Sequence, residues 1–442
     1  MARASLPRSD VADLALASEG QSRIAWAEGQ MPALRAVRER FAAQRPLDGI
    51  RIAGCLHVTA ETANLVRTLL AGGAGVALCS ANPLSTQDDV AAALVLNHGV
   101  EVRALRGESL DTYGEHVRAL LTGSPQVTID DGADLLMTAH ADDGDVLKGL
   151  IGATEETSTG LVRLRRLEDR GRLRCPVLAL NEARTERALN DRHGTGQSAL
   201  DGIVRASNVL LAGHTVVVVG YGWAGQGIAE RARGAGAVVI VCEVEPLRAL
   251  EARMAGYEVM PALAAAPRGD VFVTVTGSRR VLRGEHFAAM KDGALLANAG
   301  HFDVELDLEE LRGLASGGIR DVRPLIEQYE LGDGRKLNLL ARGRVVNLAA
   351  GEGHPAAVMD VSFALQALCV EELVRRRGEL PPGVHQVPGA IDREVGRLKL
   401  LALGVEIDQP TPEQEHYRES WGLSVPAEAA VGSASPGQGQ TA

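Results

Sequence analysis

The sequence predicts an α/β protein built from two doubly wound parallel-sheet domains joined by a hinge, with a short C-terminal helical extension. Three observations lead to this fold class. The chain has 442 residues, which is long for a single hydrophobic core. From residue 50 onward, short apolar runs typical of strands alternate with helical patterns. A glycine-rich stretch, VVVVGYGWAGQG at 216–227, then opens a second unit of the same kind.

The composition limits the classes of partner. A net charge of -11 provides no basic footprint for nucleic acid, and 3% aromatic residues are too few for base stacking. The sequence contains no run of 18 apolar residues, the length needed to span a membrane. Asp10 and Asp13 interrupt the apolar region that an N-terminal signal peptide would need. The five cysteines lack C-x-x-C spacing, which suits reduced core thiols, and no metal ligand set appears. We therefore expect a small-molecule substrate, no nucleic-acid or membrane partner, and a cytoplasmic location.

The first domain is predicted element by element from its periodicity. Residues 1–48 read mainly as helix, because apolar positions recur three and four apart until Pro46 ends the pattern. Helices are expected at 60–70 and 88–96, where glycines follow the last apolar positions. Strands are expected at 50–56, 75–79, 100–105, 126–129, 147–151 and 177–180.

Polar residues follow several of these strands. Because ligands of open α/β sheets bind outside the carboxyl ends of the strands, these side chains are expected to converge. Each also has a simpler explanation: an Asp-Asp-Gly turn, the first turn of a helix, or a structural histidine. The residues are His57 with Thr59, Ser80 with Asn82, Asp130 with Asp131, Glu155 with Glu156, and Asn181 with Glu182.

The stretch at 216–227 has the spacing of a dinucleotide-binding turn. Four β-branched residues form a buried strand, and Gly220, Gly222 and Gly225 follow in G-x-G-x-x-G order. These glycines permit a tight turn, a close approach to a pyrophosphate, and packing of helix on strand, and the helix N-terminus supplies N–H donors. Glu243 ends a second strand at 237–241, where it would meet the ribose hydroxyls. The pattern predicts a Rossmann-like unit that binds NAD rather than NADP, although Arg248 weakens this preference.

The remaining elements complete the second domain and return the chain to the first. Strands are expected at 270–276 and 294–297, and His301 follows the latter near the reacting end of the cofactor. The segment 345–354 leads out through a glycine-flexed hinge. Helices are expected at 359–374 and 390–403. The expected domains are 1–189 with 353–400 for substrate, 190–352 for NAD, a helical oligomerisation segment at 401–426, and a disordered tail at 427–442.

Nine ordered stretches of this chain match a known family. They are AGCLHVTAETA, NPLSTQDDVAAAL, DDGADL, EETSTG, RHGTGQSALDGI, GYGWAGQG, TVTGS, NAGHFDVE and GEGHPAAVMD. Across nearly its whole length the chain resembles S-adenosylhomocysteine hydrolase. Its ending, AIDREVGRLKLLALGVEID and PEQEHYRESW, resembles the short archaeal-like branch. Longer members end with a Lys and a Tyr that reach the NAD of a neighbouring subunit, and this chain lacks that ending.

The resemblance implies a redox cycle that consumes no NAD. The cofactor oxidises the 3′-hydroxyl of a nucleoside, the C4′ proton is removed, the 5′ group leaves, water adds, and the hydride returns to C3′. It implies acid and base roles for His57, Asp131 and Glu156, with His301 near the ribose or the leaving group. It further implies a homotetramer, substrate contacts from Thr59, Glu61 and His354, and cofactor contacts from Thr157, Ser158, Thr159, Glu243, Thr276 and Asn347.

One segment departs from the family pattern. In TERALND at 185–191, Glu186 stands where the family has a Lys that acts at the 3′-hydroxyl, and Asn190 stands for its Asp partner. Asp191 stands for an Asn, and His193 for a Tyr common in the short branch. Drift in a surface helix would explain the changes. A refitted site would also explain them, because losing only one partner would leave an unpaired charge. In a refitted site Glu186 or Asp191 is the candidate base for 3′ oxidation, and Asn190 a substrate contact.

The sequence leaves four hypotheses for the activity. The first is a nucleoside 5′-dehydratase that retains 3′ oxidation and 4′,5′ elimination but expels water, as would suit a nucleoside natural-product pathway. The second is an adenosylhomocysteinase proper that tolerates Glu186. The third, a 2-hydroxyacid dehydrogenase, shares the Rossmann layout but does not explain the matches before residue 190. The fourth is an NAD-binding protein without catalysis.

Overall fold

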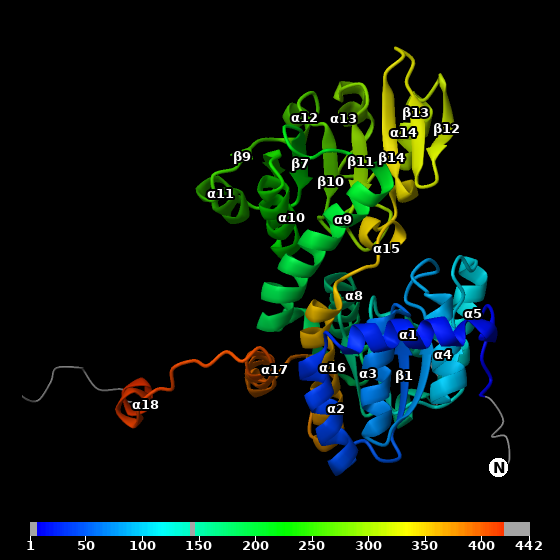
Figure 1. The fold of residues 1–442 in the computed structure, drawn as a ribbon, viewed down its shortest axis with the longest axis vertical. Coiled ribbons are helices and arrows are strands. Elements are labelled where there is room, and N and C mark those ends of the chain that lie inside the picture. Colours follow the sequence, from blue (N-terminus) through cyan, green and yellow to red (C-terminus); the bar gives the residue numbers. More distant parts are fainter. Residues whose placement is uncertain (1–6, 142–145, 420–442) are drawn as a thin grey trace, which may run out of the picture.

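The chain forms two lobes, each built on one sheet (Figure 1). The structure is a computed structural model that describes residues 7–141 and 146–419. The lower sheet is parallel throughout, and the upper sheet is parallel except for an antiparallel extension at one edge. Helices pack around both sheets, which confirms the predicted α/β class with two doubly wound sheets. The predicted domain boundaries stay a prediction.

The strand order of the lower sheet reverses between β1 and β4. From β1, the chain adds β2 and β3 on one side and then β4, β5, β6 and β15 on the other. Such a reversal leaves a crevice at the carboxyl ends of the strands, where ligands bind. In spatial order the strands are β15 (Gly383–Gln386), β6 (Pro176–Ala179), β5 (Gly152–Glu155), β4 (Val127–Asp130), β1 (Arg51–Cys55), β2 (Gly75–Cys79) and β3 (Glu101–Arg103).

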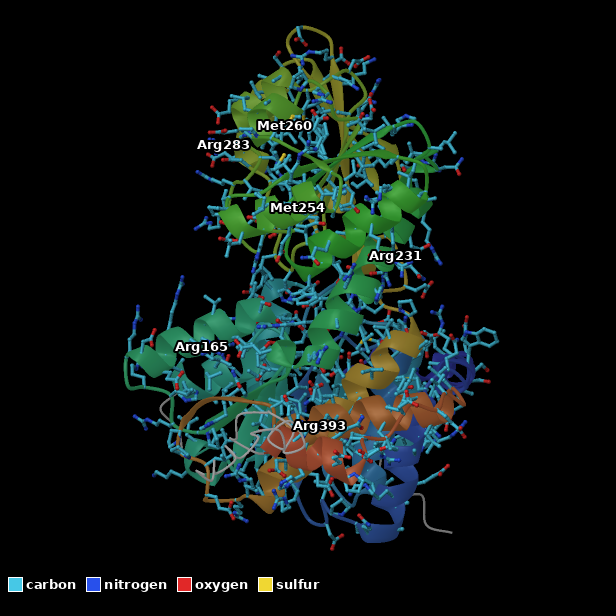
Figure 2. All side chains as sticks on the ribbon, turned by 90° about the vertical axis from the view of Figure 1, so that its left-hand side faces the viewer. Arg165, Arg231, Met254, Met260, Arg283 and Arg393 are labelled. Atoms are coloured by element: carbon cyan, nitrogen blue, oxygen red, sulfur yellow. The ribbon has the colours of Figure 1, made fainter. Side chains whose placement is uncertain are left out.

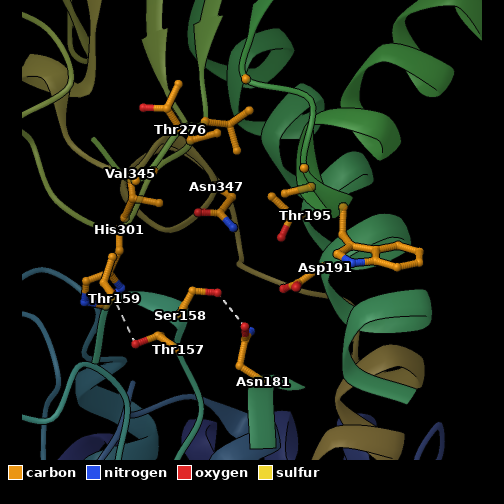
Figure 3. A pocket seen from close by; sticks show the side chains of 18 of the residues that line it. Thr157, Ser158, Thr159, Asn181, Asp191, Thr195, Thr276, His301, Val345 and Asn347 are labelled. Atoms are coloured by element: carbon orange, nitrogen blue, oxygen red, sulfur yellow. Dashed lines mark hydrogen bonds between the residues drawn. The ribbon is translucent and has the colours of Figure 1, made fainter. Parts of the chain in front are cut away.

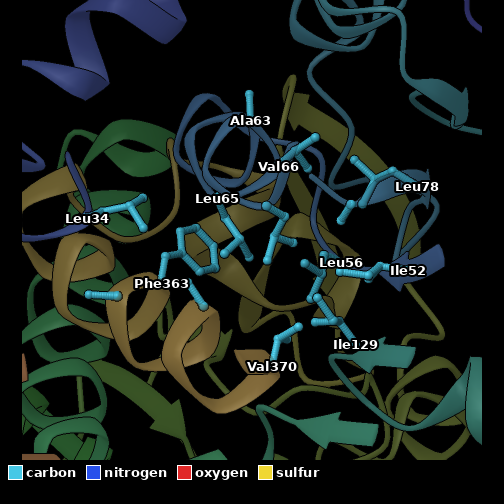
Figure 4. Close-up of a cluster of buried hydrophobic side chains, with 14 of the residues drawn as sticks. Leu34, Ile52, Leu56, Ala63, Leu65, Val66, Leu78, Ile129, Phe363 and Val370 are labelled. Atoms are coloured by element: carbon cyan, nitrogen blue, oxygen red, sulfur yellow. The ribbon is translucent and has the colours of Figure 1, made fainter. Parts of the chain in front are cut away.

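The core of the lower lobe joins both ends of the chain. The twenty-residue helix α16 (Ala356–Arg375) returns from the upper lobe and buries side chains on nearly all sides. Figure 4 shows Phe363 and Val370 of this helix among Leu34, Ile52 and Leu65. The other helices of this lobe are α1 (Ala17–Glu28), α2 (Pro32–Gln44), α3 (Ala60–Ala71), α4 (Asp88–His98), α5 (Leu110–Leu121), α6 (Asp134–Ala141), α7 (Val146–Gly149) and α8 (Ser158–Asp169).

The strand predicted at 147–151 is wrong. Residues Val146–Gly149 form the short helix α7, and the strand begins only at Gly152. The apolar side chains of Leu147 and Ile151 are buried, but against the helices and the sheet face rather than within a strand. A Cβ atom on Gly152 would lie 2.8 Å from Leu373 of α16, so the strand itself carries small residues where that helix crosses it. The apolar signal therefore lies several residues before the strand.

The upper sheet reverses its strand order between β7 and β10, directly at the glycine-rich turn. In spatial order its strands are β12 (Gly318–Arg323), β13 (Ile326–Glu330), β14 (Lys336–Leu340), β11 (Leu295–Asn298), β10 (Val271–Thr274), β7 (Thr215–Val219), β8 (Val238–Cys242) and β9 (Glu258–Val259). Its helices are α9 (Gly196–Ser207), α10 (Trp223–Gly234), α11 (Pro246–Met254), α12 (Ala262–Ala265), α13 (Gly284–Ala289), α14 (Leu308–Leu314) and α15 (Val346–Ala349). The antiparallel strands β12 and β13 were not predicted.

Short helical turns join these elements, and one of them is a π-helix. The 3-10 turns are η1 (Leu14–Leu16), η2 (Leu180–Glu182) and η4 (Ala341–Gly343), and the π-helix is η3 (Glu186–Thr195). The latter runs directly into α9 and so carries the chain from the lower to the upper lobe.

The C-terminal helices extend to one side of the body (Figure 1). They are α17 (Gly389–Ala402), which matches the predicted helix at 390–403, and α18 (Pro412–Glu419). The predicted tail at 427–442 lies outside the described residues. Among the helices that the structure describes, none combines the length and the apolar character needed to cross a bilayer.

Candidate active site

A cavity of about 1290 Å³ lies between the lobes, where the carboxyl ends of both sheets meet. This volume exceeds the usual range for one drug-sized ligand and suits a dinucleotide together with a nucleoside. Figure 3 shows residues of both lobes facing each other across it. Met260 and Arg283 also line it, and Figure 2 shows their place on the upper lobe. The cavity is lined by every residue given a catalytic, substrate or cofactor role above except Glu186 and Gly225. Of the other polar residues expected at the strand ends, Asn82 and Asn181 line it, whereas Ser80, Asp130, Glu155 and Glu182 do not.

His57 and Asp131 come together because β1 and β4 are neighbours. The Nε2 atom of His57 lies 3.1 Å from Oδ2 of Asp131, and its Nδ1 atom lies 2.7 Å from the hydroxyl oxygen of Ser85. Burial raises the pKa of Asp131, but the charge of His57 and its hydrogen bond to Asp131 outweigh burial and hold this pKa below its usual value. The ionised carboxylate and the serine hydroxyl therefore fix the orientation of the His57 ring.

His301 approaches the same point from the upper lobe. The ring centroids of His57 and His301 lie 6.3 Å apart. Gly132, with a φ of +114°, leaves room for this approach, since a Cβ there would lie 3.1 Å from Nε2 of His301. Burial lowers the pKa of His301, which favours the neutral ring. Ligand atoms of His57, Asp131 and His301 lie within 4.8 Å of one another, so these three could hold a metal ion.

Glu156 follows β5 and is suited to donate a proton. Burial raises its pKa well above the usual value, and the charges of Asp131, Glu186 and Glu155 raise it further. Its Oε1 atom is buried and has no hydrogen-bond partner among the described residues. The pKa of Glu156 is thus raised and that of Asp131 lowered, and a pair of carboxyl groups with pKa values driven apart is suited to acid and base roles.

The residues matched to substrate contacts line the part of the cavity near the hinge. Thr59 begins α3, and its hydroxyl oxygen accepts a hydrogen bond from the Thr62 N–H at 3.4 Å. Burial raises the pKa of Glu61. The Nε2 atom of His354 lies 3.2 Å from the Thr195 hydroxyl, and burial lowers the pKa of His354 to about 4. His354 therefore contributes a neutral ring.

Glu186 lies behind the cavity wall rather than in it. Its Oε2 atom accepts a hydrogen bond from the Asn190 amide at 2.7 Å, and that amide also donates to Ser362 of α16 at 2.7 Å. Burial raises the pKa of Glu186 to about 7. The Glu186 side chain is 5% exposed, which excludes drift on a solvent-facing surface as the explanation for its presence.

Asp191, by contrast, lines the cavity. Arg187 also lines it, and the sequence analysis did not predict this residue for the site. Burial raises the pKa of Asp191 to about 7, whereas the charge of Arg187 and a hydrogen bond from Asn181 oppose the rise. Arg187 precedes Asp191 by four residues, a spacing at which helical side chains meet. That spacing was the signal in the sequence that could have identified Arg187.

The glycine-rich turn has the close approaches that the motif predicts. Gly220 has a φ of +104°, and a Cβ at Gly225 would lie 2.1 Å from the carbonyl oxygen of Gly220. At Gly222 a Cβ would meet only Arg248, at 3.5 Å, so space remains on the cavity side. Gly225 thus serves packing, whereas Gly222 leaves room for a ligand. Trp223 is the first residue of α10 rather than part of the loop.

Glu243 stands at the end of β8, as predicted, and is held by main-chain donors. Its Oε2 atom accepts from the Tyr221 N–H at 2.7 Å, and its Oε1 atom accepts from the N–H groups of Val244 at 2.7 Å and Glu245 at 3.0 Å. These bonds point the carboxylate at the turn between β7 and α10, where a ribose would lie.

Further polar groups fit the nicotinamide half of a dinucleotide. Thr157 caps the N-terminus of α8, and its hydroxyl donates to Glu155 at 2.8 Å. The Ser158 hydroxyl donates to Asn181 at 2.5 Å (Figure 3). The Thr276 hydroxyl donates to Glu305 at 2.8 Å. The Oδ1 atom of Asn347 is buried without a partner among the described residues. This free acceptor and the space at the glycine turn fit NAD, whose carboxamide and pyrophosphate need such groups.

Comparisons with known proteins match both lobes to one family. Residues 8–145 match the family described as S-adenosyl-L-homocysteine hydrolase, and residues 191–353 match its NAD-binding domain. The adenosylhomocysteinase of Aquifex aeolicus is 55% identical over 94% of this chain and 99% of that protein. The adenosylhomocysteinase of Thermosynechococcus vestitus is 54% identical over 94% of this chain and 96% of that protein. The S-inosyl-L-homocysteine hydrolase of Methanopyrus kandleri is 52% identical over 93% and 97%.

The matches cover both lobes, including the part before residue 190 that a 2-hydroxyacid dehydrogenase leaves unexplained. The glycine turn, the held Glu243 and the polar groups at the strand ends provide the physical basis for the cofactor. The chain therefore belongs to the S-adenosylhomocysteine hydrolase family and is an NAD-dependent enzyme of that family.

Proposed function

We propose that this enzyme is a nucleoside 5′-dehydratase that acts on an adenine-type nucleoside in a natural-product pathway. The observation that carries the proposal is the altered segment at 186–191. The position of the family's Lys holds the buried Glu186, which is bonded to Asn190, while Asp191 faces the cavity. An enzyme with a changed 3′-hydroxyl site and an intact acid–base set around C4′ and C5′ is suited to the same oxidation with a different outcome.

Glu156 supports water as the leaving group. Hydroxide leaves poorly unless it is protonated, because the pKa of water, about 15.7, far exceeds that of a thiol, about 8.5. Burial and neighbouring carboxylates raise the pKa of Glu156 well above its usual value, which favours the protonated form. It is therefore suited to protonate a departing 5′-hydroxyl.

The proposed cycle balances as the loss of one water. NAD, when bound, takes the hydride of C3′ and later returns it. Asp191 accepts the proton of the 3′-hydroxyl during oxidation and gives it back at the end. His57, oriented by Asp131 and Ser85, removes the C4′ proton, and Glu156 protonates the 5′-hydroxyl, which leaves as water. The product is a nucleoside with a 4′,5′ double bond.

Asp191 is the better candidate for the 3′ base. It lines the cavity, whereas Glu186 lies behind Asn190. The pKa of Asp191, about 7, suits a base that must be ionised near neutrality and then carry a proton. Glu186 acts through Asn190, whose amide it holds in place.

Product analysis tests the proposal. The purified NAD-loaded protein would be incubated with adenosine and, separately, with S-adenosylhomocysteine, and the products would be identified by mass spectrometry. We expect loss of water from the nucleoside, and a Glu156→Gln variant that loses this reaction while still reducing bound NAD. Clean release of homocysteine without any dehydrated nucleoside would rule out the dehydratase.

Adenosylhomocysteinase proper is the second candidate, favoured by identities of 54% and 55% to enzymes of that name over nearly the whole chain. A Glu186→Lys variant discriminates between the two candidates. If it gains homocysteine release that the parent lacks, the parent is not an ordinary adenosylhomocysteinase. A parent that already hydrolyses S-adenosylhomocysteine supports this second function.

An NAD-binding protein without catalysis is tested by the absorbance of the bound nicotinamide, which would never show reduction with any nucleoside. A homo-oligomer, expected to be a tetramer, also stays a proposal. Leu401 and Ile407 support it, because both are largely exposed on the projecting C-terminal segment. Light scattering of the purified protein measures the assembly.

A further inference from the structure

The cavity retains a cation four residues before a carboxylate, although the family's Lys and Asp are both gone. Arg187 and Asp191 have this spacing, and both line the cavity. We propose that Arg187 and Asp191 together replace the family's Lys–Asp pair at the 3′-hydroxyl, displaced by one residue along the chain. The inference rests on the proposed function in one respect, namely that the 3′-hydroxyl is oxidised beside the cavity wall that Arg187 and Asp191 line.

The helix that carries the pair provides a reason for the displacement. Residues Glu186–Thr195 form a π-helix, in which each turn closes one residue later than in an α-helix. Its residues that line the cavity are Arg187, Asn190, Asp191 and Thr195. Glu186, which holds the family's Lys position in the sequence, turns instead toward Asn190 and Ser362. The cation therefore enters the cavity from position 187.

The electrostatics of the pair agree with this placement. The charge of Arg187 favours the ionised form of Asp191, and the Asn181 side chain donates a hydrogen bond to the same carboxylate. Asp191 in turn raises the pKa of Glu186, together with burial and Asp392. The charged groups that act here are thus the Arg187 guanidinium and the carboxylates of Asp191, Glu186 and Asp392, and Glu186 acts in turn on Glu156. Arg187 is the cation that favours an ionised Asp191 facing the cavity.

A Lys can both accept the 3′-hydroxyl proton and donate hydrogen bonds to O3′, whereas here these two functions fall to two different side chains. A guanidinium stays protonated in proteins, so Arg187 cannot accept the 3′-hydroxyl proton. Asp191 takes this proton as the C3′–O3′ bond becomes a carbonyl, an oxidation in which bound NAD would accept the hydride. The N–H donors of Arg187 hold O3′ as negative charge develops on it.

Binding provides a test that needs no turnover. The NADH-loaded protein cannot oxidise adenosine, so calorimetry can compare adenosine with 3′-deoxyadenosine. We expect the parent to bind adenosine roughly tenfold or more tightly than 3′-deoxyadenosine, because charge-assisted hydrogen bonds to the 3′-hydroxyl form only with adenosine. A Arg187→Gln variant should lose most of this preference, and Arg187→Lys should retain part of it. Arg184→Gln is the matched control, because Arg184 is exposed and does not line the cavity.

Single-turnover reduction of bound NAD by adenosine provides the second test. We expect Arg187→Gln to slow reduction about a hundredfold, the usual loss for one donor to a developing oxyanion, and guanidinium ion in solution to restore part of the rate. The acid limb of the pH profile should move to higher pH, because Arg187 no longer favours the ionised Asp191. Asp191→Asn should abolish reduction at every pH.

The two proposals fail separately. If Arg187→Gln retains both the preference for the 3′-hydroxyl and the rate of NAD reduction, the inference about Arg187 is overturned even when the product is an alkene. If the parent releases homocysteine and never water, the dehydratase is overturned, while the tests on Arg187 keep their meaning. Thermal unfolding of each variant identifies any loss that is due to misfolding.

Discussion

Asp392 on α17 holds Thr185 at the start of the π-helix. Its Oδ1 atom accepts hydrogen bonds from the Thr185 N–H at 3.1 Å and from the Thr185 hydroxyl at 2.5 Å. Its Oδ2 atom accepts from the N–H of Arg184 at 2.9 Å. A helix from the C-terminal part thus caps the segment that forms one wall of the cavity, and it supplies acceptors for main-chain donors that the first turn leaves unpaired.

Removing this cap should loosen the cavity wall. We expect Asp392→Ala to lower the free energy of unfolding by about 2 kcal/mol, because several bonds to a charged acceptor are lost. Reduction of bound NAD by adenosine should slow in parallel. Glu394→Gln is the control, since Glu394 lies on the same helix and forms an ion pair with Arg397, an exposed contact of small energy. Equal behaviour of the two variants in denaturant would contradict the capping role.

Gly225 should tolerate no side chain. A Cβ atom there would lie 2.1 Å from the Gly220 carbonyl, so Gly225→Ala must displace α10 from the glycine turn. We expect the variant to be purified with little bound NAD, measured by absorbance after denaturation. Gly234→Ala on the same helix meets nothing within 4 Å and should retain the cofactor content of the parent. A fully loaded Gly225→Ala protein would show that the turn has more room than this distance allows.

Glu186→Gln should stabilise the protein at high pH. The pKa of Glu186 is raised by burial from about 4.5 to about 7 in the folded state, so the folded protein favours the protonated form. Stability from this group is complete below pH 4.5 and is lost as the pH rises through 7, at a cost of about 3 kcal/mol. The variant should gain on the parent in thermal unfolding across this window. A constant difference between pH 5 and 9 would contradict the raised pKa.

Glu243 should decide between NAD and NADP. Its carboxylate fills a nest of N–H groups from Tyr221, Val244 and Glu245, and Arg248 lies beside the turn. Glu243→Ser vacates donors that a 2′-phosphate can use. We expect the affinity for NADP to rise at least about tenfold, measured by calorimetry on the apoprotein. A double variant that also carries Arg248→Gln should lose this gain. If it retains the gain, Arg248 does not contact the phosphate.

Much of the fold was accessible from local chemistry. The predicted strands at 75–79 and 216–219 and the helix at 60–70 agree with the structure within one or two residues. The prediction failed at 147–151, where apolar residues pack beside the sheet while the strand that follows them carries Gly152. It also missed β12, whose residues are exposed throughout, and β13, in which only Ile326 and Tyr329 are buried.

The sequence by itself determined the two α/β units, the dinucleotide turn and the polar residues at the strand ends. These follow from periodicity and from backbone conformations that only glycine adopts readily, both of which are local properties. The tertiary structure alone decided which side of the altered helix faces the cavity. Asn190, which bonds Glu186, is also held by Ser362 of α16, a partner distant in the chain, while Arg187 and Asp191 both line the cavity. Burial and distant charges also set the pKa values on which the proposed chemistry depends.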